Sequence, residues 1–397
     1  MSTALLCSPD GVERVQQALR DQELDGWLLY EFHGVNPIAV QLLGMGKTTR
    51  RGFVLIPEKG RPVALIHAIE ASSWRHWPFE SRTYSSWQEM EVELRELLDG
   101  CTRLATEVSP GAAVPTLDYL PAGMAGLILS FGVEAVSSGD LVSRFHSVWT
   151  PEQLQMHRQA AEIVADVARQ AFARAAAAVE SGSPTNEGDL SEWIRSQLSA
   201  HGLTVSPDCI VAIGRTAADP HYSPEGKGET ITAGDLLLID LWGAFDGAVF
   251  ADQTWMGLLS GTVDSRTQEI WNAVRDARDA AVTFLREQFE LGGEVRGYEV
   301  DQVARALIAD RGYGDYFVHR TGHSMDIDLH GSGPNLDNLE TRDDRLLVPG
   351  IGFSVEPGIY IPDEIGVRSE INVYWGSDGP EVTPGDIQQE IFLLMDV

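Results

Sequence analysis

Seven polar residues in the second half of the sequence have types and surroundings that suit metal chemistry. Asp240 follows four consecutive leucine or isoleucine residues, and Glu356 follows Phe353-Ser354-Val355. A carboxylate in a buried strand is costly unless it is paired or bound to a cation. Several such carboxylates beside a histidine would repel one another without cations between them. In chain order, the candidates are His221, Asp240, Asp252, His323, His330, Glu356 and Glu370.

The donor types predict a site for hard or borderline divalent cations. Several carboxylates with one imidazole suit manganese first, with cobalt and zinc as alternatives. Bridging carboxylates can hold two ions about 3.5–4 Å apart, so this set suits two ions better than one. The three cysteines, Cys7, Cys101 and Cys209, are far apart and form no C-x-x-C pair that would favour a structural zinc site or a disulfide framework.

The pattern of apolar residues predicts the helices and strands that must position these side chains. Thr150-Pro151-Glu152-Gln153 is a capping box with proline at the first helical position, and an alanine-rich helix follows until Gly182. Alternation of further apolar segments with turn residues predicts an α+β arrangement. It comprises helices near 187–200, 266–289 and 298–310, and strands near 210–213, 236–240 and 352–356.

The first part of the chain has a different, α/β pattern. At 397 residues the chain exceeds the roughly 250–300 residues at which single cores stop growing, so two domains are expected. The predicted domains are an N-terminal α/β domain, 1–148, and a catalytic domain, 149–397. In the first we expect helices near 12–22 and 89–98 and strands near 26–30, 53–57 and 63–67.

Five segments of the second part resemble the pita-bread metallopeptidases, which include methionine aminopeptidases, aminopeptidase P, prolidases and creatinase. The additional N-terminal domain resembles the prolidase, aminopeptidase P and creatinase branch, and Leu28–Gly34 and Ser137–Leu141 resemble shorter bacterial Xaa-Pro peptidases. The resemblance implies a curved antiparallel sheet flanked by helices. The matching segments are 220–222, Ile239-Asp240 with Asp252-Gln253-Thr254, 319–324, 355–360 and 367–370.

The resemblance also implies a role for each candidate. Asp240 would chelate one ion, Asp252 and Glu370 would bridge two, and His323 with Glu356 would complete the second. A hydroxide between the ions would be the nucleophile, with its pKa lowered from about 15.7 towards about 7. Glu356 would also move a proton. His221 and His330 would hold substrate and intermediate, and Arg368 would orient Glu370.

Three features depart from the family pattern. The first two aspartates are twelve residues apart, one more than the usual spacing. Trp255 stands where an arginine often occurs, and Asp326 replaces a usual glycine. Asp246 is a rival for the second aspartate, but Asp246-Gly247 is a strong turn pair. We therefore expect a hairpin that turns near Asp246 and places Asp252 opposite Asp240, with the extra residue absorbed in the turn or in a bulge.

Other conspicuous residues receive plainer interpretations. His319 is interpreted as structural, and Asp326 and Asp328 as solvated loop charges. Gly331-Ser332-Gly333 is interpreted as a turn, because no strand–helix context supports phosphate binding. Three tryptophans are assigned to core or interface, namely Trp74, Trp77 and Trp87.

Composition excludes several classes of protein. The net charge of −30 disfavours nucleic acid as a partner, because an acidic surface repels phosphates. No apolar run approaches the roughly 18 residues of a membrane span, and the first residues lack the basic region of a secretory signal. Sparse cysteines favour a reducing cytoplasm. By analogy with relatives, we expect a homodimer.

The sequence as a whole predicts a cytoplasmic dinuclear metallopeptidase that cleaves Xaa-Pro dipeptides, a prolidase. Aminopeptidase P activity on longer Xaa-Pro peptides is the nearest alternative. A metal-independent creatinase-like hydrolase and a non-catalytic binding module are the others, and the intact set of ligands argues against both.

Overall fold

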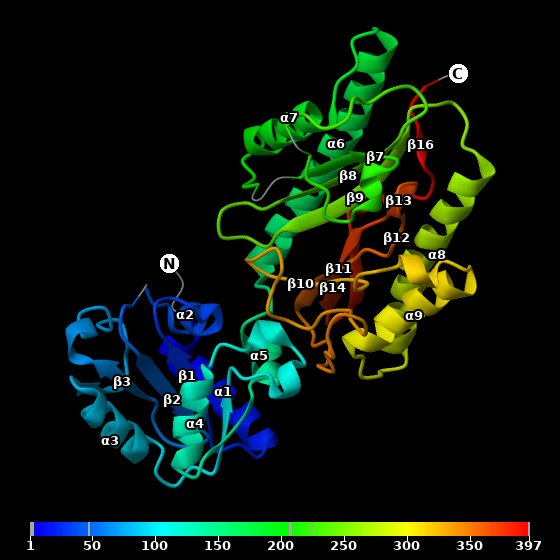
Figure 1. Ribbon diagram of the computed structural model, residues 1–397. Helices are drawn as coiled ribbons and strands as arrows, with labels where there is room; N and C mark the ends of the chain where they lie inside the picture. Colours follow the sequence, from blue (N-terminus) through cyan, green and yellow to red (C-terminus); the bar gives the residue numbers. More distant parts are fainter. Residues whose placement is uncertain (1–3, 47, 206–208, 225, 396–397) are drawn as a thin grey trace. The chain divides into compact units, whose positions relative to one another are not determined.

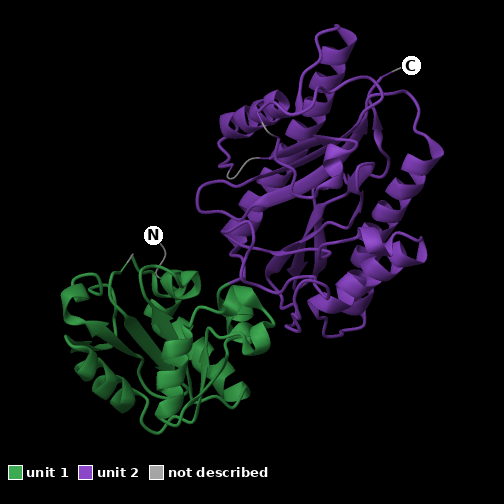
Figure 2. Ribbon diagram, in the orientation of Figure 1, with its two compact units in different colours: residues 1–146 green, residues 147–397 purple. Residues whose placement is uncertain are grey.

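The computed structural model describes residues 4–46, 48–205, 209–224 and 226–395. The chain divides into two compact units, Met1–His146 and Ser147–Val397, which Figure 2 distinguishes by colour. This division falls two residues before the predicted one. No helix in the described ranges is both long enough and apolar enough to cross a membrane.

The first unit is a six-stranded mixed sheet covered on both faces. Its strand order is β4-β3-β2-β1-β5-β6, antiparallel from β3 to β1 and parallel elsewhere. Trp27 and Leu29 pack into one core, and the alternate residues Leu28 and Tyr30 pack into another. Burial on both faces explains the continuous apolar runs of these strands. The strands are β1 (Gly26–Glu31), β2 (Gly52–Pro57), β3 (Val63–His67), β4 (Glu80–Tyr84), β5 (Arg103–Thr106) and β6 (Glu134–Ser137).

The predicted elements of this unit are confirmed within a few residues. The longest helices are α1, which begins at a serine cap, and α3, which begins at the capping box of Ser86 and Glu89. The helices are α1 (Pro9–Asp21), α2 (Pro37–Leu43), α3 (Trp87–Leu97), α4 (Ala122–Ser130) and α5 (Gly139–Phe145).

The second unit begins with the predicted long helix. The Thr150 side chain accepts a hydrogen bond from the Gln153 amide, and the Gln153 side chain accepts one from the Thr150 amide, so the capping box is confirmed. Gly182 follows the helix end with a φ of 71°, which glycine adopts at little cost. The helices are α6 (Pro151–Glu180), α7 (Glu187–Ala200), α8 (Ser265–Glu290) and α9 (Gly297–Asp310).

Two four-stranded sheets and a separate hairpin form the rest of this unit. Their orders are β16-β9-β8-β7 and β10-β11-β14-β15, with β12 paired to β13. Figure 1 shows α6 and α7 beside the first sheet and α8 and α9 beside the second. The strands are β7 (Ile210–Ile213), β8 (Leu236–Gly243), β9 (Ala251–Leu258), β10 (Ser324–Met325), β11 (Ile351–Val355), β12 (Gly358–Ile361), β13 (Ile365–Arg368), β14 (Ile371–Gly376), β15 (Gly379–Thr383) and β16 (Phe392–Leu393).

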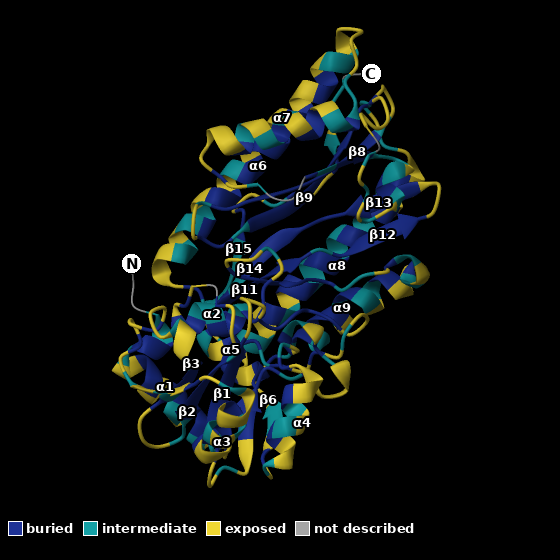
Figure 3. Cartoon of the chain, turned by 60° about the vertical axis from the view of Figure 1, so that its left-hand side comes forward, coloured by how far each residue is buried: buried dark blue, intermediate teal, exposed yellow. Residues whose placement is uncertain are grey.

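Strand β8 shows how the layers create an interior for polar residues. Leu237 and Ile239 pack with the helices α6 and α7. Leu236 and Leu238 face the opposite way, into the core shared with α8 and the strands β11 and β14. Since side chains alternate along a strand, Asp240 points to the same interior face as Leu236 and Leu238. Figure 3 shows these central strands buried beneath helices whose outer faces are exposed.

Candidate metal centre

The β8–β9 hairpin carries the first two predicted ligands. Asp246 lies exposed in the turn, and the register between the strands is regular, so the extra residue is absorbed in the connection and not in a bulge. The expectation that Asp252 lies directly opposite Asp240 was wrong, because the register differs from it by two residues. Asp252 pairs with Trp242, and Asp240 pairs with Thr254. The two aspartates are thus diagonal neighbours on one face, which still keeps their side chains close.

His323 and Glu356 approach from the second sheet. His323 immediately precedes β10, and Glu356 immediately follows β11. Ser354 joins them, because its hydroxyl accepts from the His323 amide at 2.9 Å and donates to Glu356 Oε1 at 3.0 Å. His323 Nε2 then lies 3.4 Å from Asp252 Oδ2 and 3.5 Å from Glu356 Oε1. The imidazole therefore sits between carboxylates from both sheets.

Glu370 lies in the bend between β13 and β14 and is fixed by Thr254. The Thr254 hydroxyl donates to Glu370 Oε2 at 2.8 Å and accepts from Arg368 Nε at 2.8 Å. Arg368 Nη2 also donates a charged hydrogen bond to Asp240 Oδ2. The structure thus connects Arg368 directly to Asp240 and, through Thr254, to Glu370.

Three carboxylate oxygens in this centre are buried and make no hydrogen bond to any described residue. They belong to Asp240 (Oδ1), Asp252 (Oδ1) and Glu370 (Oε1). Ligand atoms of Asp252, His323 and Glu370 all lie within 4.8 Å of one another. Asp240 is not part of this close group and adjoins it through Arg368. Buried polar atoms normally have partners, so carboxylates with unpaired oxygens beside an imidazole have the donor chemistry of a cation site. The residues present therefore fit a divalent metal.

The pKa values of the carboxylates in the cluster also support a cation site. Burial raises the pKa of Asp240 to about 7 despite the opposing charge of Arg368. Burial, followed by the negative charges of Asp252 and Glu356, raises the pKa of Glu370 well above its usual range. Burial disfavours the charge on Glu356 too, but His323, His319, Arg368 and the hydrogen bond from Ser354 together lower its pKa. Cations among these groups would remove the repulsion that keeps some of them protonated.

The two histidines predicted to contact substrate lie at the exposed side of the cluster. The rings of His330 and His323 are 4.4 Å apart, edge to face. Partial burial, then repulsion from His323 and, more weakly, from His221, lowers the pKa of His330. His221 is exposed, and the carbonyl of the preceding Pro220 accepts a hydrogen bond from Arg368 at 3.4 Å. Both imidazoles can therefore be reached from solvent.

Asp326 corrects one interpretation of the sequence. It is buried, and only Asp328 is an exposed loop charge. Its two carboxylate oxygens accept from the amides of Asp328 and Ser332, at 2.8 and 3.0 Å, and so span the loop that carries His330. A glycine at 326 could not make these bonds. Trp255, the other departure, packs against Phe392 on the face of β9 opposite Asp252 and is a core residue.

Sequence reasoning did not assign roles to three residues that hold the ligands. Thr254 and Ser354 each contact two site residues, as described above. Asn372 on β14 exchanges two hydrogen bonds with the backbone of Asp252, donating at 2.7 Å and accepting at 3.0 Å. A buried asparagine or hydroxyl beside a ligand is the signal that could have identified them, because such groups need partners. His319, interpreted as structural, bonds the hydroxyl of Tyr360 at 2.8 Å.

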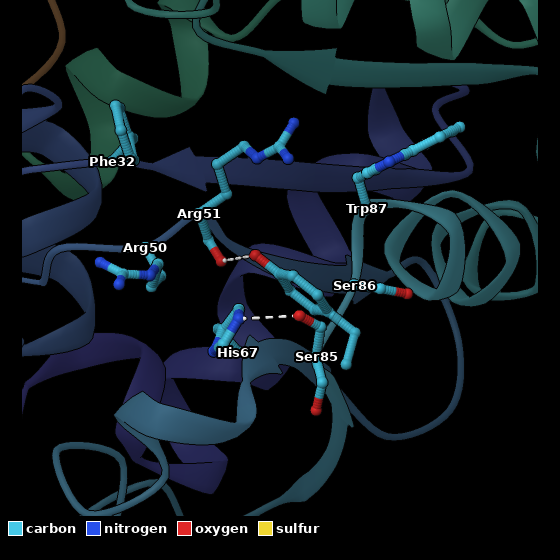
Figure 4. Close-up of a pocket in the computed structure, with 8 residues that line it drawn as sticks. Phe32, Arg50, Arg51, His67, Ser85, Ser86 and Trp87 are labelled. Carbon is cyan, nitrogen blue, oxygen red and sulfur yellow. Dashed lines mark hydrogen bonds between the residues drawn. The ribbon is translucent and has the colours of Figure 1, made fainter.

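A separate pocket of about 500 Å³ lies in the first unit (Figure 4). The Tyr84 hydroxyl donates to the Arg51 carbonyl at 2.7 Å, and the His67 ring bonds the Ser85 carbonyl at 3.2 Å. Trp87 is exposed here, whereas Trp74 and Trp77 are buried as expected. All predicted site residues belong to the second unit, whereas the residues that line this pocket belong to the first. It is lined by Phe32, Arg50, Arg51, His67, Tyr84, Ser85, Ser86 and Trp87.

The chain is similar to several known peptidases. Residues 155–376 match metallopeptidase family M24. A probable dipeptidase, PepE, of Mycobacterium tuberculosis is 28% identical over 331 residues, which cover 82% of this chain and 81% of the relative. The crystal structure of the dipeptidase PepE from Mycobacterium ulcerans superposes with a TM-score of 0.73 at 22% identity, covering 96% of both chains. An Xaa-Pro dipeptidase from Bacillus anthracis superposes with a TM-score of 0.67 at 25% identity, covering 96% of this chain and 99% of that one.

The matched family segment spans more than half of the chain and contains every residue of the cluster. The chain belongs to metallopeptidase family M24. It has the pita-bread fold of that family in its second unit, and it is a divalent-metal-dependent peptidase.

Proposed function

We propose that this metallopeptidase holds two divalent cations, manganese by preference, and hydrolyses the Xaa-Pro bond of dipeptides. The observation that carries the proposal is the group of Asp252, His323 and Glu370, together with the three unpaired buried carboxylate oxygens of Asp240, Asp252 and Glu370. Two cations would neutralise these groups, activate water and polarise the scissile carbonyl. The names of the relatives support the choice of an Xaa-Pro substrate. We further expect a homodimer in the cytoplasm.

The residues of this chain would divide the remaining work. Asp240, Asp252, His323, Glu356 and Glu370 would supply the ligands, and Asp252 and Glu370 would each be a ligand to both ions. Glu356, whose pKa is lowered, is a base at neutral pH and can accept a proton from the attacking water.

The two exposed histidines would contact the substrate. His330 remains neutral at neutral pH, because its pKa is lowered, and its N–H can donate a hydrogen bond to an oxygen that becomes negative in the transition state. His221 would bind the peptide from the other side. Arg368 would hold Asp240 in place, and its charge favours the ionised form of that carboxyl.

Hydrolysis assays with paired substrates test the proposal. An Xaa-Pro dipeptide and the matching Xaa-Pro tripeptide are compared at equal concentration in manganese, cobalt and zinc. A kcat/KM higher for the dipeptide than for the tripeptide is expected. A preference for the tripeptide would indicate aminopeptidase P activity. Hydrolysis of neither would contradict the assignment to Xaa-Pro bonds.

A further inference from the structure

A fully buried arginine lies on helix α8, among residues that pack into the core. Arg278 has no exposed surface, and the other buried residues of α8 are apolar apart from Thr267. Its Nε and Nη2 donate to Asp279 Oδ1 at 2.9 and 2.7 Å, and the Asp279 side chain is 38% exposed. Burying a guanidinium is costly unless its donors find partners. The ion pair with Asp279 leaves the N–H groups of Nη1 without a partner. The other side of Arg278 therefore needs partners in the interior.

Those partners adjoin the metal centre. Arg278 Nη1 donates to the hydroxyl of Ser369 at 2.7 Å. Ser369 lies between Arg368 and Glu370, in the bend between β13 and β14. Its amide also donates to the carbonyl of Pro357, the residue after Glu356, at 3.4 Å. Arg278 thus contacts the segment that supplies Glu370.

The same nitrogen connects to the strand that supplies Asp252. Arg278 Nη1 donates to the carbonyl of Gln388 at 2.7 Å. The Gln388 side chain accepts from the Met256 amide at 2.9 Å and donates to the Met256 carbonyl at 2.6 Å. Met256 lies on β9, four residues beyond Asp252 and on the same face. The network therefore joins β9 to the β13–β14 bend.

We propose that Arg278 is a positioning residue for the metal centre, which fixes the separation of Asp252 and Glu370 through Gln388 and Ser369. The inference rests on the proposed metal site. Asp252 lies on β9 and Glu370 in the bend between β13 and β14, so without a brace between these segments metal binding would have to fix the separation of the two side chains. Ligands held in place by neighbouring hydrogen bonds avoid that cost. Arg278 touches neither metal nor substrate.

The substitution Ser369→Ala tests this with little disturbance, because it removes one hydrogen bond and leaves the arginine, its ion pair and the Gln388 contact. Ser143→Ala is the matched control. Ser143 is also buried, and its hydroxyl donates to the Gly139 carbonyl at 2.9 Å within the first unit. Manganese affinity of each metal-free protein is measured by isothermal titration calorimetry, together with the thermal midpoint.

Manganese affinity should fall about tenfold in Ser369→Ala, and by at least as much in Arg278→Lys, which loses the guanidinium fork. In Ser143→Ala it should stay within twofold of the original protein. If Ser369→Ala lowers the thermal midpoint but leaves manganese affinity within twofold, Arg278 only stabilises the fold and the inference is overturned. If the unsubstituted protein binds no manganese, the proposed metal site itself fails. Should Arg278→Lys not fold, Ser369→Ala still decides.

Discussion

Both units of this protein bury carboxylates, but among the described residues only the second unit has buried carboxylate oxygens without a hydrogen-bond partner. In the first unit, Glu107 accepts hydrogen bonds from Trp27 Nε1, Ser138 Oγ and Asn36 Nδ2, at 2.7, 3.1 and 2.9 Å. Both of its oxygens are occupied. In the second unit, three carboxylates each leave one buried oxygen without a hydrogen bond from the described residues. An acid that the protein satisfies by itself is structural, whereas acids left unsatisfied together require a cation.

The largest effect is expected from changing a ligand shared by both ions. Glu370→Gln should remove metal and lower kcat/KM by about a thousandfold or more, since an amide lacks the charge that bridges two cations and the loss is about 4 kcal/mol of stabilisation. Elemental analysis and dipeptide hydrolysis measure the two effects. Unchanged metal content with unchanged activity would remove Glu370 from the cluster.

The β8–β9 hairpin offers a matched pair of aspartates. Asp252→Asn should abolish activity and weaken metal binding, because Asp252 faces the cluster. Asp246→Asn should change activity less than about threefold, because substitutions in exposed turns are nearly neutral. Parallel assays of the two variants check this. An inactive Asp246→Asn beside an active Asp252→Asn would show that the alignment of the hairpin is wrong.

A substitution beside the ligands should separate catalysis from binding of metal. His330→Ala should lower kcat about 10²–10³-fold, as expected on loss of a hydrogen-bond donor to the transition state, while metal content is unchanged. Steady-state kinetics at saturating manganese and elemental analysis are the measurements. Loss of metal from this variant would make His330 a ligand and not a donor to the intermediate.

Substitution of the structural carboxylate Glu107 should have the smallest effect. It should change the pH dependence of stability and leave metal binding unchanged. Burial raises the pKa of Glu107 to about 7, so the folded protein holds its proton more tightly than the unfolded chain. Its contribution to stability is therefore complete below about pH 4.5 and is lost as pH rises to about 7, by up to about 3 kcal/mol. Glu107→Gln, which cannot titrate, should lack this slope and retain metal. Urea unfolding between pH 4.5 and 8 measures the difference, and identical slopes would contradict it.

Much of this arrangement could be predicted from the sequence because it depends on local rules. The capping box at Thr150, the Asp246-Gly247 turn and the apolar runs of β8 and β11 each leave a short-range pattern. The order of acidic residues and histidines in the second half indicated a metal centre through the chemistry of the donors. These signals do not require knowledge of which strands are neighbours.

What could not be predicted depends on contacts between distant segments. Asp252 is offset by two residues from the position opposite Asp240. This offset depends on where the strands end and the turn begins, which the number of residues between the two aspartates does not fix. Burial of Asp326 depends on the loop closing over it. The interior role of Arg278 depends on α8, β9 and the β13–β14 bend meeting, and a lone arginine in a helix gives no sign of that.

The central claim is that the unsatisfied carboxylates of the second unit hold two divalent cations. The most direct test is elemental analysis of the purified protein after dialysis with and without added manganese. The account predicts about two metal ions per chain after manganese is added, with the number unaffected by Glu107→Gln. A protein that carries no metal under these conditions would contradict it, and a single ion per chain would contradict the dinuclear centre.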